Sequence, residues 1–457
     1  MQPRRFWPPY LSLPLILLAG FLAILWVAGG ASRGDVIGQA ITRAGAWGIL
    51  LIAITLGGRP DFRSLRPILY LFVAIFAIPL LQMVVLPPLL WENLPGRDLF
   101  LLDDELKDWR PAAIVPGATL NSLLALTVPA ALFVVISILD EKDKKYILPM
   151  LFLFLLACCI LGLLQFSGAN AYSPFVNSVH GSVSSIFANR NHFALLIAIS
   201  CMVTTAWGVQ SRGNLHWRIP ILVALFILQT MMILAVGSRT GLLLLAISVL
   251  LSSALVANRV KRRLRQSPKW LPPVLVLTGL FVMVGFIALS FFAGRVEAFD
   301  RLLTLSVDDD LRTQSWPTLL KMIGAYFPFG AGLGSFDPIF RLNEPLTLLS
   351  GQYFNQAHND FLGVAIDAGA PGVILLIVAG AWWFHATVGV VRAKESEEIV
   401  LARLGSALLF LVFVASATDY PARTPAIMGV VVIAAAWLSR GNFVRRRSAL
   451  PKLAADV

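Results

Sequence analysis

A short polar motif, "AHND" at residues 357–360, contains the residue best suited to chemistry in this apolar chain. His358 is one of five histidines, and it follows a polar stretch, residues 294–355, that interrupts a series of long apolar runs. Imidazole exchanges a proton near neutral pH, so His358 can act as a general base that removes a proton from a hydroxyl group. A histidine that only closes a loop or caps a helix is the alternative interpretation.

The two residues after His358 have supporting roles in this interpretation. Asp360 is two positions from His358, and side chains at that spacing do not share a helix face. We therefore expect Asp360 to cap the next helix or to contact a substrate, with Asn359 beside it, rather than to complete a catalytic triad. His192, within "SSIFANRNHFA", is a weaker candidate for a base.

Two arginines at the ends of apolar runs are candidates for binding an anion. Arg190 lies in "SSIFANRNHFA" and Arg239 in "VGSRTGLL". An arginine at membrane depth costs about 2.5–3.5 kcal/mol on insertion scales. Its planar guanidinium suits phosphate because it donates two parallel hydrogen bonds. Asn191 and Ser238 adjoin these arginines, and Ser238 can cap the following helix or donate to the same anion. Interfacial snorkelling of both arginines is the alternative.

A third arginine lies in the polar stretch itself. Arg312, in "DDDLRTQSWPTLL", supplies either a further anion contact or a salt bridge to Asp308, Asp309 or Asp310. We interpret no part of the sequence as a DxD motif or carboxylate cluster that holds a divalent cation. We therefore expect chemistry without a metal ion or another cofactor.

The apolar runs that hold these residues predict an all-α polytopic membrane protein. The chain has 457 residues, of which 58% are hydrophobic and 14% charged, and its mean hydropathy is +0.78. Many runs reach the ~17–25 residues that cross a bilayer as a helix, and they are continuous, which argues against a β-barrel. We expect about twelve spans in a single transmembrane domain, residues 1–457. The predicted spans are 10–30, 44–58, 67–87, 118–138, 146–166, 190–209, 219–236, 240–257, 271–293, 363–391, 400–418 and 423–439.

The distribution of charge sets the orientation of these spans. The net charge is +12, and the basic clusters fall in short loops on one side, which places both termini in the cytoplasm. This distribution argues against a nucleic-acid partner and favours contact with anionic membrane lipids. The three cysteines lie within apolar runs and have the spacing of neither a disulfide framework nor a zinc site.

Two sizeable segments fall on the non-cytoplasmic side. Residues 88–117 are acidic, and we assign them no role. Residues 294–357 form the largest loop, between spans nine and ten, and "TQSWPTLLKMIGAYF" within it is amphipathic and suited to lie on a membrane surface. The alternating Gly330, Gly332 and Gly334 in the same loop allow tight turns or a close approach of the backbone to a ligand.

Four of these pieces together resemble the O-antigen ligase and polymerase family of bacterial membrane glycosyltransferases. The pieces are "SSIFANRNHFA", "GSRTGLLLL", "LRTQSWPTLLKMIGAYFPFGAGLGSF" and "QAHNDFLGVAIDAGAPGVILL", and they occur in the family's order and locations. The resemblance covers residues 180–380 well, while the first five spans match only in hydropathy. It implies a GT-C-like fold in which residues 294–357 form a large helical periplasmic loop.

The resemblance also implies a reaction and its partners. Such enzymes transfer a glycan from undecaprenyl diphosphate to an acceptor at the periplasmic face of the bacterial inner membrane, without a metal. In this chain Arg190 and Arg239 would bind the diphosphate, and His358 would activate the acceptor hydroxyl, with inversion at the anomeric carbon. A ligase that uses lipid A–core as acceptor is favoured, and a polymerase that extends a lipid-linked glycan stays open.

Two further classes rank lower. Protein O-oligosaccharyltransferases usually carry an additional C-terminal domain, whereas this chain ends soon after its last predicted span. A twelve-span transporter would need ionisable residues inside the spans and two related halves. The predicted spans contain almost no Asp, Glu, Lys or Arg, which disfavours transport.

Overall fold

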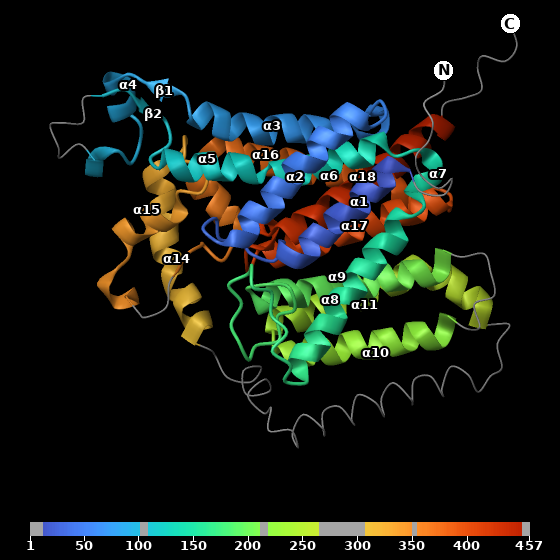
Figure 1. Ribbon diagram of the computed structural model, residues 1–457. Coiled ribbons are helices and arrows are strands. Elements are labelled where there is room, and N and C mark those ends of the chain that lie inside the picture. Colours follow the sequence, from blue (N-terminus) through green and yellow to red (C-terminus); the bar gives the residue numbers. More distant parts are fainter. Residues whose placement is uncertain (1–11, 101–107, 211–217, 265–306, 350–353, 450–457) are drawn as a thin grey trace, which may run out of the picture.

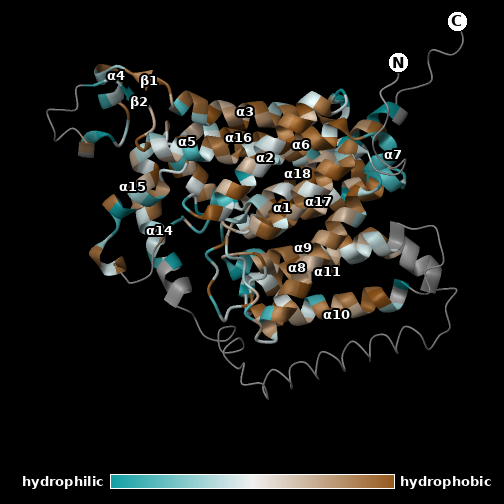
Figure 2. Cartoon of the chain, in the orientation of Figure 1, coloured by the Kyte–Doolittle hydropathy of each residue, from teal (hydrophilic) through white to brown (hydrophobic). Residues whose placement is uncertain are grey.

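The computed structural model of the chain is an α-helical bundle, described for residues 12–100, 108–210, 218–264, 307–349 and 354–449 (Figure 1). Its long helices run side by side, and hydrophobic residues recur along their length (Figure 2). These helices are α1 Leu13–Ala28, α2 Ile37–Leu56, α3 Arg66–Gln82, α5 Pro116–Ala125, α6 Thr127–Ile138, α8 Ile147–Phe166, α9 Arg190–Gln210, α10 Arg218–Val236, α11 Arg239–Leu264, α16 Asp360–Arg392, α17 Glu397–Ser416 and α18 Pro425–Ala449.

The prediction of an all-α polytopic membrane protein is confirmed. Within the described residues, nine stretches are long and apolar enough to cross a bilayer, and α1 and residues 220–236 are shorter apolar helices. The predicted ninth span, residues 271–293, lies outside the described residues, so the total of twelve stays a prediction.

The predicted start of the second span was wrong. We expected residue 44, but α2 begins at Ile37 because a polar turn with Gln39 and Thr42 is buried against neighbouring helices. Gln39 donates to the Ala31 carbonyl at 2.5 Å, and Thr42 donates to carbonyls of its own helix. These contacts satisfy the hydrogen bonds of two polar side chains. The same side chains lower the local hydropathy, so the apolar pattern of the sequence did not include the first turns of the helix. The correction places Arg43 inside a membrane helix.

The shorter elements gather at the two ends of the bundle. Figure 1 shows α4, α14, α15 and a small sheet at one end, and α7 at the other. In the sheet, β1 and β2 pair antiparallel, with Val85 opposite Pro111. The short elements are β1 Val85–Leu86, α4 Pro88–Glu92, β2 Arg110–Pro111, α7 Glu141–Lys144, α14 Val307–Tyr326 and α15 Phe336–Asn343, with 3₁₀ turns η1 Arg63–Leu65, η2 Asp98–Phe100, η4 Leu346–Leu348 and η5 Pro421–Arg423.

The predicted large loop is helical where it is described. Helix α14 contains "TQSWPTLLKMIGAY" and packs against α16. Its buried residues Ser315, Leu319, Met322 and Tyr326 recur at the spacing of one helix face. The loop is therefore fixed to the helix that follows His358.

A glycine turn after α14 fixes α16 at a kink. Gly330, Gly332 and Gly334 all have φ between 79° and 110°, so the predicted tight turns are present. The helix is interrupted at Gly369, and the carbonyls released there accept hydrogen bonds from the turn. The backbone N–H of Gly332 donates to the Asp367 carbonyl at 2.9 Å, and that of Gly334 donates to the Asp367 carboxylate at 3.1 Å.

Replacement of Gly330 by alanine is expected to destabilise the protein by about 2 kcal/mol or more. A left-handed backbone costs an L-residue about 1–2 kcal/mol, and the added Cβ would lie 2.5 Å from the Asp367 carbonyl oxygen. Gly324→Ala is the control, because Gly324 is exposed in α14 with nothing within 4 Å of a new Cβ. Thermal unfolding in detergent measures both. Equal midpoints for the two variants would rule out the turn as a stabilising element.

Candidate active site

A buried carboxylate, Asp419, organises the end of the bundle at which α9, α16 and α18 begin, which we call the site end. Asp419 lies in the turn between α17 and α18 and is 2% exposed. Asn189 donates its side-chain amide to both carboxylate oxygens, at 3.0 and 3.2 Å, and Asn191 donates to Oδ2 at 2.8 Å. Two amides at the start of α9 therefore satisfy a carboxylate on a distant turn.

Two imidazoles meet the same carboxylate. His358 Nδ1 lies 3.5 Å from Asp419 Oδ1, and His192 Nε2 lies 3.6 Å from the same oxygen. The ring of Tyr420 packs edge-on against both, with centroids 5.0 Å from His358 and 5.2 Å from His192. A guanidinium completes the cluster, because Arg312 from α14 lies 3.8 Å from Asp419 Oδ2.

The electrostatics of this cluster keep Asp419 ionised. Burial acts to raise the pKa of the carboxyl, but the attraction of His192 and His358 outweighs burial and holds that pKa well below its ordinary value of 3.8. A carboxylate that is ionised and fixed beside an imidazole selects its tautomer and stabilises its protonated form.

Of the two imidazoles, His358 is the one that a substrate can reach. Its side chain is 17% exposed, against 1% for His192. Its Nδ1 faces Asp419, and its Nε2 makes no hydrogen bond to any described residue. His358 has φ +46°, a left-handed backbone that is uncommon outside glycine and is concentrated at functional sites. Nε2 is thus available to accept a proton.

The residues after His358 begin α16, and the expected cap was misplaced. Asn359, not Asp360, is the N-cap, because its Oδ1 accepts from the backbone N–H groups of Phe361 and Leu362 at 3.0 Å. Asp360 instead accepts from the Ser416 hydroxyl at 2.8 Å and pairs with Arg423 at 3.5 Å. From the first helical position, the Asp360 carboxylate thus contacts partners on α17 and η5.

The two predicted anion-binding arginines begin helices that meet at the site end. Arg190 is the first residue of α9, between Asn189 and Asn191, and Arg239 is the first residue of α11. Ser238 joins the two helices: its hydroxyl donates to Asn191 Oδ1 at 2.8 Å and accepts from the Gly241 N–H at 3.0 Å. The predicted capping role of Ser238 is confirmed, and hydrogen bonds connect it through Asn191 to Asp419.

Arg312 forms an ion pair that we did not expect. Its contact is with Asp419, far along the chain. The side chains of the neighbouring Asp308, Asp309 and Asp310 lie outside the described set. The helix α14 thus brings a cation to the site end from the large loop.

Asp419 is the residue that sequence reasoning missed. It lies in "TDYPAR", a short turn between two apolar spans on the same side as His358. A lone carboxylate at membrane depth is a functional signal in its own right. The other histidines fall elsewhere: His180 contacts Asn170, His385 contacts Arg446, and His216 lies outside the described residues.

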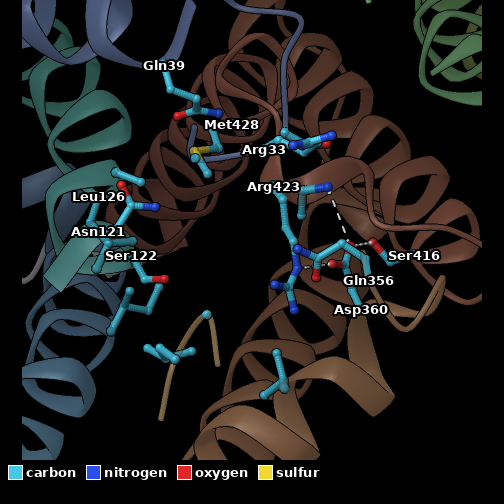
Figure 3. A pocket seen from close by; sticks show the side chains of 18 of the residues that line it. Arg33, Gln39, Asn121, Ser122, Leu126, Gln356, Asp360, Ser416, Arg423 and Met428 are labelled. Atoms are coloured by element: carbon cyan, nitrogen blue, oxygen red, sulfur yellow. Dashed lines mark hydrogen bonds and ion pairs between the residues drawn. The ribbon is translucent and has the colours of Figure 1, made fainter. Parts of the chain in front are cut away.

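A cavity of about 750 Å³ adjoins the cluster. Asn355 and Gln356, just before His358, line it, as do Ala422 and Arg423, just after Tyr420. Figure 3 shows its opening between the labelled side chains of α2, α5 and α17–α18, with the Asp360 pairs to Arg423 and Ser416 on one wall. The site end therefore has a buried catalytic-type cluster and a separate space large enough for part of a substrate.

Comparison with known proteins gives a family for the middle of the chain. Residues 223–377 match the family model described as O-antigen ligase. This segment is similar to that family. The predicted resemblance is thereby confirmed, and it supports a glycosyltransferase of the O-antigen ligase or polymerase type that acts on lipid-linked glycans. Arg239, Arg312 and His358 lie inside the segment, whereas Asp419 lies outside it. No curated protein matches the chain.

Proposed function

We propose that this protein is an O-antigen ligase that transfers a glycan from undecaprenyl diphosphate to lipid A–core. The observation that carries the proposal is the contact between His358 and Asp419, at 3.5 Å, with the outer imidazole nitrogen available. An Asp–His pair of this kind activates a hydroxyl nucleophile. The family of residues 223–377 supports a hydroxyl on a glycan-bearing lipid as that nucleophile.

The reaction follows from the positions of the charged groups. The acceptor oxygen forms a bond to the anomeric carbon of the donor glycan, and its proton passes to His358 Nε2. The bond between that carbon and the diphosphate oxygen breaks, and the electron pair leaves with the polyprenyl diphosphate. Attack opposite the leaving group inverts the anomeric centre. Asp419 stabilises the imidazolium that forms.

The leaving diphosphate needs cations near the site end. We assign this role to Arg190 and Arg239, which begin α9 and α11, where helix N-termini also favour an anion. Arg312 is a further cation for the diphosphate, because its contact with Asp419 holds it at the site end. Asn191 and Ser238 hold the two helix starts together, and Asn359 and Asp360 fix α16 beneath His358. No step is assigned to a metal or another cofactor.

The orientation is part of the proposal. We infer an inner-membrane protein with cytoplasmic termini and a periplasmic site. In the helix order, the start of α1 and the end of α18 fall at the end opposite Asp419, which agrees with that topology. The positive-inside distribution of Lys and Arg supports the same sidedness.

Deletion of the gene in its host distinguishes the candidate activities. A ligase predicts lipopolysaccharide without attached O-antigen, while full-length glycan accumulates on its lipid carrier. A polymerase, the second candidate because the matched family segment is shared, predicts single-repeat glycans. Unchanged surface glycans would contradict both.

Arg239→Lys is expected to lower glycan transfer by about tenfold or more. Lysine keeps the charge but lacks the planar fork that binds two phosphate oxygens at once, and a charged hydrogen bond contributes about 1.5–3 kcal/mol. Arg59→Lys is the matched control, because Arg59 is exposed beyond the far end of α2. The measurement is transfer of a labelled glycan by purified protein. Equal rates for both variants would remove Arg239 from diphosphate binding.

A further inference from the structure

An arginine inside the membrane bundle has no countercharge among the described residues. Arg43 lies in the second turn of α2 and lines the cavity beside the candidate active site. Its guanidinium donates to Asn121 Oδ1 at 2.5 Å and to Gln39 Oε1 at 3.2 Å, and both partners are neutral. Its Nε is buried with no hydrogen-bond partner in the described structure. Two neutral acceptors thus orient a cation whose charge they leave uncompensated.

The other arginines of this cavity are paired with carboxylates. Arg33 forms a salt bridge with Asp35. Arg423 lies between Asp360 and Asp367, at 3.5 and 3.6 Å. An uncompensated cation at membrane depth is costly and marks a functional site by default. The difference between Arg43 and its neighbours therefore points to an anion that the ligand itself supplies.

The walls of the cavity specify what carries this anion. Around Arg43 the lining is polar, with Gln39, Asn121 and Ser122 from α2 and α5 (Figure 3). A second part of the lining is apolar and consists of Ile75, Leu126, Leu376, Leu409, Val412, Phe413, Met428 and Val431. The remaining charged side chains of the lining include Arg33 with Asp35 and Arg423 with Asp360, which pair with each other. An unpaired cation beside an apolar wall fits an amphipathic molecule, with a charged headgroup at Arg43 and hydrocarbon along α17 and α18.

The cavity is also distinct from the proposed diphosphate site. Its lining excludes Arg190, Arg239 and Arg312. Asn355 in its lining accepts a hydrogen bond from the Tyr420 hydroxyl at 3.5 Å, and the Tyr420 ring packs against His358. A molecule in this cavity would therefore contact other residues than a ligand at the starts of α9 and α11.

We propose that the cavity binds the phosphate-bearing headgroup of an anionic lipid, with Arg43 as its counterion. Gln39 and Asn121 hold the guanidinium so that its remaining N–H groups face the phosphate. The use of this lipid as the glycan acceptor rests on the proposed function, whereas lipid binding does not.

Lipid binding to the purified full-length chain tests the proposal. The probes are phosphatidic acid, phosphatidylcholine with the same acyl chains, and inorganic phosphate, each titrated in detergent and measured by native mass spectrometry. We expect tighter binding of phosphatidic acid than of the other two. Arg43→Gln should weaken the binding of phosphatidic acid by about tenfold or more, since it removes a charged hydrogen bond. The affinity for phosphatidylcholine should not change.

Three variants keep the result interpretable. Arg59→Gln removes the same charge beyond the other end of α2 and should bind like the wild type. Arg43→Lys retains the charge but lacks the planar fork, so it should bind phosphatidic acid less tightly than the wild type and more tightly than Arg43→Gln. Leu126→Trp fills the cavity from its apolar wall and should lose the lipid without altering Arg43.

Several outcomes would overturn the proposal. Wild-type affinity of Arg43→Gln for phosphatidic acid would do so, as would equal weakening by Arg59→Gln, which indicates surface attraction only. Inorganic phosphate that binds as tightly as the lipid would show a free-anion site instead. The assay contains no glycan donor, so its result is independent of whether the proposed transfer reaction is correct.

Discussion

Asp419→Asn is expected to reduce glycan transfer by about 10³–10⁴-fold, the scale seen when the carboxylate behind a catalytic histidine becomes an amide. The substitution preserves shape but removes the charge that faces His358, His192 and Arg312. It also places an N–H₂ group where Asn189 and Asn191 donate. The imidazolium formed during attack then has no countercharge.

The measurement is the rate of transfer from a labelled polyprenyl diphosphate donor by purified protein. Asp98→Asn is the control, because Asp98 is exposed in η2. Thermal unfolding of each variant separates loss of fold from loss of chemistry. A rate for Asp419→Asn within threefold of the control, in a folded protein, would show that the carboxylate has no part in the reaction.

His358→Asn is expected to lower transfer by about 10²–10⁴-fold, the usual contribution of a positioned general base. Asparagine is the preferred replacement because it adopts a left-handed backbone more readily than most residues, and His358 has φ +46°. Binding of the diphosphate donor should be retained, since we assign that role to arginines on α9 and α11.

The matched control is His180→Asn, because His180 is exposed in the segment before α9, where it contacts Asn170 and the Tyr172 ring. Transfer rate and donor affinity are measured for both variants. An unchanged transfer rate in His358→Asn would exclude a general base at this position. Loss of donor affinity with the same fractional loss of rate would reassign His358 to donor binding.

The sequence was sufficient for most of the span pattern, and it singled out His358, which lies beside the buried Asp419 in the structure. Long continuous apolar runs leave a helix as the structure that satisfies its own backbone in lipid, so most span borders were predictable to within a few residues. A histidine beside a polar loop is visible for the same reason: ionisable residues are rare against this background. The predicted start of α2 failed because Gln39 and Thr42 gain their hydrogen-bond partners only in the folded bundle.

Asp419 could not be assigned from its neighbours in the chain. Its partners lie on α9, α14 and the start of α16, and no local spacing relates them. Arg43 was missed for another reason: the predicted second span began after it. That its described partners are neutral amides becomes visible only in the packed cavity. Tertiary contacts, rather than residue types, identify both.

The most direct test of the catalytic pair is a double-mutant cycle of transfer rates for Asp419→Asn, His358→Asn and the combined variant. If Asp419 acts through His358, removal of the imidazole already abolishes the benefit of the carboxylate. The account then predicts that the double variant is no slower than the slower single variant, within about threefold. A double variant slowed by the product of the two single effects would contradict it, because the two residues would then act independently.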